Sequence, residues 1–167
     1  MRNELYWVNG QWPGKLAVGP RPRGGDWLED DIANWKRARV NTVLSLLMPD
    51  EEQHFDLRDE AGEVRRQGMG FTSFPIPDRQ VPKSEAKLAE VLESVSRDLS
   101  SGKNVLIHCR QGIGRSGLVA ACLLVKNGTS PGAAVESVTT ARGISVPETE
   151  EQRDWIDHYS AAVTGSK

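Results

Sequence analysis

Residues 104–125 read NVLIHCRQGIGRSGLVAACLLV, and the order of apolar and small residues in this stretch decides the fold. Residues 104–107 predict a short strand buried on both faces, because apolar residues follow one another without alternation. Residues 117–125 predict a buried helix. A strand, a glycine-containing turn and a helix N-terminus make an anion site, because backbone N–H groups converge there and the helix dipole adds about half a positive charge.

Two reactive side chains flank this turn, Cys109 after the strand and Arg115 at the start of the helix, with five residues between them. Helix N-termini and cationic neighbours favour ionisation of a thiol, so we expect Cys109 to be a thiolate at neutral pH. Arg115 offers a planar fork of donors for two phosphate oxygens. Ser116 lies where its hydroxyl can stabilise the sulfur as it leaves a covalent intermediate. The segment can therefore hold a phosphate and attack it.

The residues inside the turn are expected to bind the substrate phosphate. Glycines allow backbone angles that residues with a Cβ reach only at a cost, so the amides can point inward. The alternative is a buried structural cysteine beside a surface arginine. The predicted substrate-binding residues of the turn are Arg110, Gln111, Gly112, Ile113 and Gly114.

The run fits the Cys-x5-Arg-Ser signature of the protein tyrosine phosphatase superfamily, including the preceding His108. It resembles most closely the small dual-specificity members, in particular the kinase-associated phosphatase type. There, too, a Gly-Leu/Ile-Gly-Arg-Ser loop runs into a Leu-Val-Ala-Ala-Cys-Leu-Leu helix. The resemblance implies a cysteine-dependent phosphatase with a phosphocysteine intermediate and no cofactor. His108 is expected to fix the loop through backbone hydrogen bonds.

A general acid is the next requirement, because a leaving alkoxide or phenolate departs more easily when it is protonated. Two aspartates follow prolines after predicted strands, Asp78 and Asp50. The superfamily carries its acid on a loop upstream of the cysteine, commonly after a proline, and Asp78 lies 31 positions before Cys109. The resemblance therefore selects Asp78, with Asp50 as the second candidate and a plain turn residue as the alternative. The neighbouring Arg79 could bind phosphate, pair with the acid or be solvated.

A glutamine near the C-terminal end is a further candidate. Residues 142–152 resemble a stretch of related phosphatases in which a Gln after Pro-x-Thr lies near the active site. The resemblance implies that Gln152 orients the water that hydrolyses the phosphocysteine; the alternative is a surface glutamine at an acidic helix start. Cys122, the other of two cysteines, is expected in the core, with a redox partnership with Cys109 as the alternative.

The rest of the chain alternates predicted strands and helices. This alternation predicts an α/β fold, a single domain over residues 1–167 with a core at about 16–160 and a mainly parallel sheet of about four to five strands flanked by helices. Such sheets bind ligands at the carboxyl ends of their strands, where the cysteine turn falls. Further strands are expected at residues 15–20, 40–47 and 71–75, an ordered proline-rich loop at 75–82, and helices at 26–38 (capped by Asp26), 52–67, 84–101, from 131 (capped by Ser130) and 147–163.

The composition of the chain argues against some classes of binding partner. The net charge is −2 and charged residues make up 26%, which argues against nucleic acid or an anionic membrane as partner. No apolar run reaches membrane-spanning length, and the first residues lack a signal-peptide core. With a catalytic rather than structural first cysteine, we expect a cytoplasmic protein, monomeric by default. No group of His, Cys or carboxylates has metal-ligand spacing, so no metal is expected.

The cysteine turn also bears on the substrate. Arg110 is its only basic residue before Arg115, whereas superfamily members that use polyphosphorylated inositides often carry lysines there. The chain lacks the extended N-terminal recognition segment of the tyrosine-specific enzymes, which favours a shallower pocket. We therefore expect a protein phosphatase acting on phosphotyrosine and also on phosphoserine and phosphothreonine. The alternatives are a non-catalytic phosphate-binding module, a phosphoinositide phosphatase, and a rhodanese-like sulfurtransferase or arsenate reductase.

Overall fold

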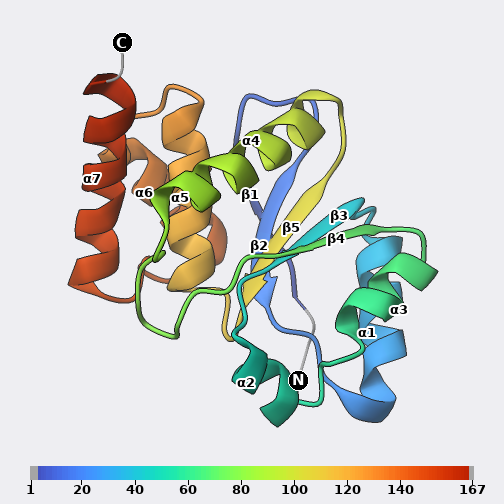
Figure 1. Ribbon diagram of the computed structural model, residues 1–167. Helices are drawn as coiled ribbons and strands as arrows, with labels where there is room; N and C mark the ends of the chain where they lie inside the picture. Colours follow the sequence, from blue (N-terminus) through green and yellow to red (C-terminus); the bar gives the residue numbers. More distant parts are fainter. Residues whose placement is uncertain (1–3, 166–167) are drawn as a thin grey trace.

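The computed structural model describes residues 4–165, which form a five-stranded sheet flanked by helices (Figure 1). The strands lie in the order β1-β2-β5-β3-β4, and all neighbours are parallel except the β1–β2 pair. This arrangement confirms the predicted α/β fold with a mainly parallel sheet. The strands are β1 (Tyr6–Val8), β2 (Leu16–Pro20), β3 (Thr42–Ser45), β4 (Gly70–Ser73) and β5 (Val105–Cys109).

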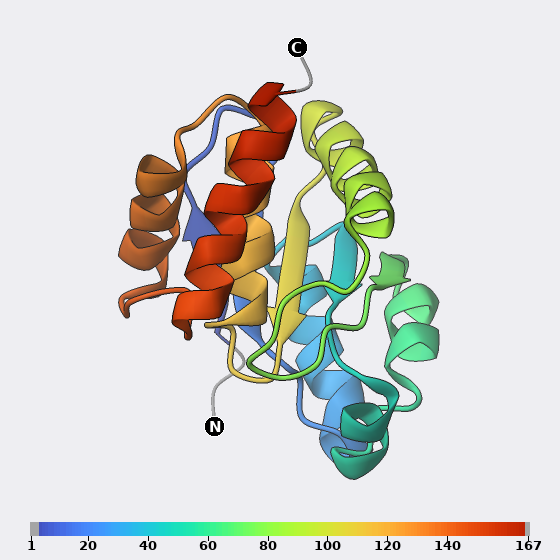
Figure 2. The same cartoon turned by 60° about the vertical axis from the view of Figure 1, so that its left-hand side comes forward.

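The helices cover both faces of the sheet (Figures 1 and 2). One apolar cluster joins the sheet to α1 and α3, and the other joins it to α4, α5, α6 and α7. A 3-10 turn, η1 (Gly25–Trp27), precedes α1. The helices are α1 (Leu28–Arg37), α2 (Pro49–His54), α3 (Glu60–Arg66), α4 (Glu85–Ser100), α5 (Arg115–Lys126), α6 (Pro131–Arg142) and α7 (Glu150–Gly165).

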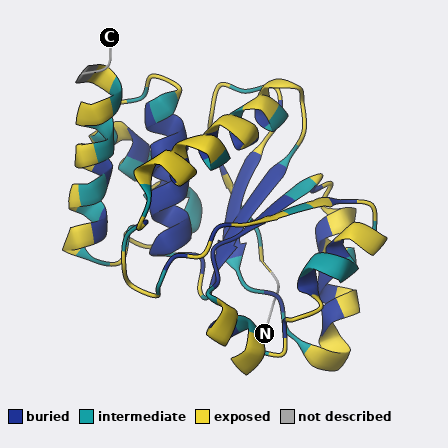
Figure 3. Ribbon diagram, viewed as in Figure 1, coloured by how far each residue is buried: buried dark blue, intermediate teal, exposed yellow. Residues whose placement is uncertain are grey.

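The centre of the molecule is the β5–α5 unit that the opening stretch predicts (Figure 3). Every residue of β5 is buried, and so is α5 from Arg115 to Val125. Alternate side chains of β5 enter opposite clusters: Ile107 and Cys109 pack towards α5, whereas Leu106 packs towards α1. The cysteine therefore leaves the sheet at the carboxyl end of its central strand.

Local signals position two of the helices as expected. The Ser130 hydroxyl accepts a hydrogen bond from the Ala133 amide and Pro131 follows at the first helical position, as predicted for α6. Ser84 caps α4 in the same way, through the Lys87 amide. The prediction that Asp26 caps the first helix is wrong. Asp26 lies inside η1, whose N-cap is Gly24, and α1 has no side-chain cap.

The segment predicted as one helix over 52–67 is instead two helices, α2 and α3. The chain leaves α2 at Phe55 and Asp56 takes a positive φ of 56°, which lets the next residue, Leu57, turn into the core. Strand β1 was not predicted, because three residues of an antiparallel edge strand give too short a pattern. Within residues 4–165, no helix is both long and apolar enough to cross a bilayer.

We predict that Leu92→Ala lowers the free energy of unfolding by about 2–5 kcal/mol, because the fully buried Leu92 fills the cluster between α4 and α5. Urea denaturation measures this loss. The exposed substitution Glu90→Ala on the same helix is the control, with an expected change within about 0.5 kcal/mol. Equal effects of the two substitutions would contradict the assigned packing of α4.

Candidate active site

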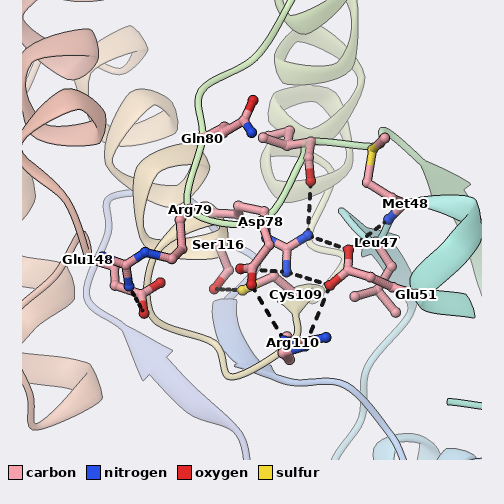
Figure 4. A network of polar contacts seen from close by, with 12 residues as sticks. Leu47, Met48, Glu51, Asp78, Arg79, Gln80, Cys109, Arg110, Ser116 and Glu148 are labelled. Carbon is pink, nitrogen blue, oxygen red and sulfur yellow. Dashed lines mark hydrogen bonds and ion pairs between the residues drawn. The ribbon is translucent and has the colours of Figure 1, made fainter. Parts of the chain in front are cut away.

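The cysteine loop, residues 109–115, joins β5 to α5 at the carboxyl edge of the sheet (Figure 4). Cys109 is the last residue of β5 and pairs in register with Pro20 of β2. Its Sγ lies 3.3 Å from the Oγ of Ser116, and both side chains are almost completely buried. A hydroxyl at this distance can donate a hydrogen bond to the sulfur.

Arg142 holds the backbone of the cysteine loop from one side. Arg142 of α6 donates to the carbonyl oxygens of Gln111 (3.3 Å) and Gly112 (3.1 Å) from outside. Because the N–H and C=O of a trans peptide unit point in opposite directions, the amides of Gly112 and Ile113 face away from Arg142. Gly112 has a φ of 74°, and a Cβ there would lie 2.5 Å from the carbonyl carbon of Gly19. Only glycine fits this close approach.

Arg115, the last residue of the cysteine loop, has a buried side chain that is 1% exposed. Two parallel hydrogen bonds of 2.6 and 2.9 Å join it to the carboxylate of Glu51, and a third of 2.9 Å reaches the Ile76 carbonyl oxygen. Burial alone would lower the pKa of Arg115, but the hydrogen bond to Glu51 and the negative charges of Cys109, Glu51 and Asp78 raise it. Arg115 is therefore a fixed positive charge beside the sulfur.

Glu51 is the residue that sequence reasoning missed. It sits in the first turn of α2, and its Oε1 also accepts the Met48 amide at 3.0 Å. Burial would raise the pKa of Glu51, but the hydrogen bonds from Arg115 and Met48 and the charges of Arg115 and Arg110 lower it overall. A glutamate in a polar segment gives no periodic signal, so only the fold reveals that it meets Arg115.

Asp78 lies at the rim of the pocket, on the acid loop, residues 75–82. Its carboxylate is 3.2 Å from Arg115 and 3.5 Å from Arg110 (Figure 4). The alternative acid, Asp50, is exposed in the first turn of α2 and does not line the pocket. The pocket has a volume of about 50 Å³ and is lined by Asp78, Cys109, Arg110, Gln111, Gly114, Arg115 and Glu148.

The acid loop is tied to the start of α7. Arg79 forms an ion pair of 2.9 Å with Glu148, rather than with the acid (Figure 4). Gln152 is fully buried; its Oε1 accepts the Glu148 and Thr149 amides, and its Nε2 donates to the Gln80 carbonyl at 3.0 Å. The predicted water-orienting role of Gln152 stays a prediction, since both ends of its amide hold backbone in this arrangement.

His108 points to the opposite face of the sheet from Cys109. Its Nε2 lies 2.5 Å from Glu60 of α3, both side chains are fully buried, and its Nδ1 lies 3.4 Å from the Cys109 carbonyl oxygen. The ring is also 5.6 Å from that of Trp35. Glu60 is a second buried glutamate that the sequence did not point to, and it fixes the strand directly behind the cysteine loop.

Two further predicted features concern cysteine and metal chemistry. Cys122 is a free thiol in the apolar core on α5, where burial raises its pKa. Among residues 4–165, no group of three or more His, Cys, Asp or Glu side chains is arranged to hold a metal ion.

Comparisons with known proteins identify the family of the chain. A family model described as PTP-SAK, Swiss Army Knife protein, DSP-PTPase phosphatase domain, matches residues 3–158. Cyclin-dependent kinase inhibitor 3 of Rattus norvegicus is 36% identical over 134 residues, which are 79% of this chain and 63% of that protein. The chain thus spans less than two thirds of the length of this relative.

Solved structures share the fold. The crystal structure of kinase-associated phosphatase with its catalytic-site cysteine changed to serine has a TM-score of 0.88 at 21% identity, covering 98% of this chain and 97% of that one. The structure of Tk-PTP in its active form has a TM-score of 0.76 at 27% identity, covering 96% and 98% of the two chains.

We predict that Glu51→Gln lowers the free energy of unfolding by about 1.5–3 kcal/mol at neutral pH, because a buried guanidinium loses its charged partner. The pKa of Glu51 is lower in the folded than in the unfolded chain, so this stabilisation is present above the ordinary value of 4.5 and is lost as the pH falls through the folded value. Denaturation series from neutral to acid pH measure the difference, with the exposed Asp50→Asn as control. A difference that does not shrink below pH 4.5 would contradict the assignment.

Proposed function

The chain belongs to the PTP-SAK family of DSP-PTPase phosphatase domains, and from this premise we propose that it is a cysteine-dependent protein phosphatase. Its substrates would be phosphotyrosine and also phosphoserine and phosphothreonine side chains of proteins. The observation that carries the proposal is the meeting of a buried cysteine, a buried arginine and a rim aspartate in one small pocket. Nucleophile, anion binder and acid are the three groups that phosphoryl transfer to a thiol requires.

In the first step the phosphate group enters the pocket and its oxygens bind the loop amides and the guanidinium of Arg115. Cys109 attacks phosphorus as a thiolate, and the bond between phosphorus and the ester oxygen breaks. Asp78 gives its proton to that oxygen, so that the alcohol or phenol leaves neutral. The distance of 3.2 Å between the Asp78 carboxylate and Arg115 supports this role.

In the second step water attacks the phosphocysteine. Asp78, now a carboxylate, accepts a proton from this water, and the sulfur–phosphorus bond breaks to release inorganic phosphate. The Ser116 hydroxyl, 3.3 Å from the sulfur, stabilises the departing thiolate by donating a hydrogen bond. Gln152 remains our candidate for orienting this water.

The other functions are less well supported. A non-catalytic phosphate-binding module would have no need of Cys109, Arg115 and Asp78 together. A polyphosphorylated inositide would meet the carboxylates of Asp78 and Glu148 at the pocket lining, with Arg110 as the extra cation. A sulfurtransferase or arsenate reductase that relied on a second thiol would find Cys122 enclosed in the core. A cytoplasmic, monomeric phosphatase without cofactor or nucleic-acid partner remains the expectation from the sequence.

Hydrolysis of a small aryl phosphate tests the proposal. We predict that the wild-type protein hydrolyses it, that vanadate inhibits the reaction, and that Cys109→Ser abolishes it because serine stays protonated at neutral pH. Cys122→Ser is the matched control and is expected to retain activity. A wild-type protein as inert as Cys109→Ser would contradict the proposal.

We predict that Asp78→Asn slows turnover about 10²–10⁴-fold, the usual contribution of a general acid. The loss should be greatest for substrates with poor leaving groups, because these depend most on protonation of the ester oxygen. Rates on a series of aryl phosphates of increasing leaving-group pKa measure this dependence. Asp50→Asn is the control, and a loss in that variant with Asp78→Asn unaffected would transfer the role to Asp50.

A further inference from the structure

Two arginines from different segments lie against one aromatic ring beside the catalytic pocket. The guanidinium of Arg21 is 3.7 Å from the centre of the Phe55 ring, and that of Arg110 is 4.9 Å from the same centre. Arg21 directly follows β2, and its amide donates to the Arg110 carbonyl oxygen at 3.2 Å. Phe55 ends α2, the helix that carries Glu51. We call these three residues the arginine cluster.

The two positive charges of the arginine cluster are unequally paired with carboxylates. Among residues 4–165, Arg21 has no carboxylate within 4.0 Å, and its guanidinium donates only to the neighbouring Pro22 carbonyl. Arg110 lies 3.5 Å from Asp78 and 3.7 Å from Glu51, both of which also face Arg115 (Figure 4). The Nε of Arg110 is buried and has no hydrogen-bond partner in the described part of the chain.

A partly buried positive charge without a carboxylate partner, as on Arg21, is energetically unfavourable. Burial, and after it the positive charge of Arg110, lower the pKa of Arg21, so the charged form of Arg21 is less favourable here than in water. Other arginines around the pocket have partners: Arg79 pairs with Glu148, and Arg142 donates to two loop carbonyls. An anion placed beside Arg21 and Arg110 would relieve the repulsion and supply the missing acceptors.

We propose that the arginine cluster binds a second anionic group of the substrate protein, a phosphate or carboxylate on a residue close to the phosphorylated one. This inference rests on the proposed function and narrows its substrate class to phosphorylated sites with an acidic or phosphorylated neighbour. Arg110 lines the catalytic pocket and belongs to the arginine cluster, so the two anions are bound side by side.

The surroundings favour a polypeptide rather than a compact polyphosphate as the ligand. A second pocket of about 490 Å³ adjoins the catalytic one and shares Arg110 and Gln111 with it. Tyr6, Pro20 and Ile113 line this second pocket together with the oppositely charged Glu4 and Arg142. Such a mixed, open lining suits the side chains on either side of a phosphorylated residue.

Calorimetric titration of the Cys109→Ser protein tests the proposal without turnover. The probes are one phosphotyrosine peptide with neutral neighbours and versions of it with glutamate or phosphothreonine at each of the flanking positions. We expect at least one doubly anionic version to bind about tenfold more tightly than the neutral peptide. Adding Arg21→Gln should reduce that ratio to below about threefold, because the guanidinium that meets the second anion is gone.

The matched control is Arg97→Gln on α4, which removes an equal charge from an exposed position lining a different pocket. It should leave the ratio unchanged. Equal affinities for all peptides, no binding of any peptide, or an equal fall of the ratio in both variants would overturn the proposal. Tighter binding of inositol tetrakisphosphate than of every doubly anionic peptide, lost in Arg21→Gln, would overturn the polypeptide ligand in favour of a lipid headgroup.

Turnover of the same peptides by the protein with Cys109 separates this inference from the proposed function. If the binding ratio depends on Arg21 but no peptide is hydrolysed, the phosphatase assignment fails and the anion site stands. If the peptides are hydrolysed with equal kcat/KM whatever their neighbours, the anion site fails and the phosphatase assignment stands.

Discussion

The buried guanidinium of Arg115 determines how the segments around the active site are arranged. A charge 1% exposed to solvent is tolerated only with a charged, hydrogen-bonded partner, and Glu51 supplies it in bidentate geometry. This requirement fixes where α2 must lie after β3. The third hydrogen bond, to the Ile76 carbonyl, fixes the entry to the acid loop. One side chain thereby assembles segments that are far apart in the sequence.

The same contacts determine how positive and negative charges are arranged around Cys109. Arg115 and Arg110 each lie within 4 Å of the carboxylates of both Glu51 and Asp78, so two cations face two anions beside the sulfur. In the proposed mechanism, an entering phosphate would compete with Asp78 for Arg115, while the ion pair between Arg115 and Glu51 would stay in place. In the proposed mechanism, Arg115 would therefore contact both the bound phosphate and Asp78.

The parts of this arrangement that depend on local sequence patterns could be predicted from the sequence. The β5–α5 unit follows from consecutive apolar residues around two glycines, and Ser130 with Pro131 marks the start of α6. Glu51 and Glu60 could not be predicted from the sequence, because each is a polar residue on a short polar helix. Their partners are far away in the chain: Arg115 lies 64 positions after Glu51, and His108 lies 48 positions after Glu60. The break between α2 and α3 was missed for the same reason, since the burial of Leu57 depends on tertiary packing.

The central claim is that phosphorus bonds to the sulfur of Cys109 during turnover, and rapid acid quenching tests it most directly. The protein is mixed with an excess of aryl phosphate, denatured in acid within the first turnover, digested and analysed by mass spectrometry. We expect a phosphate on the peptide that contains Cys109 and none on the peptide that contains Cys122. Turnover with Cys109 free of phosphate at every quench time would contradict it.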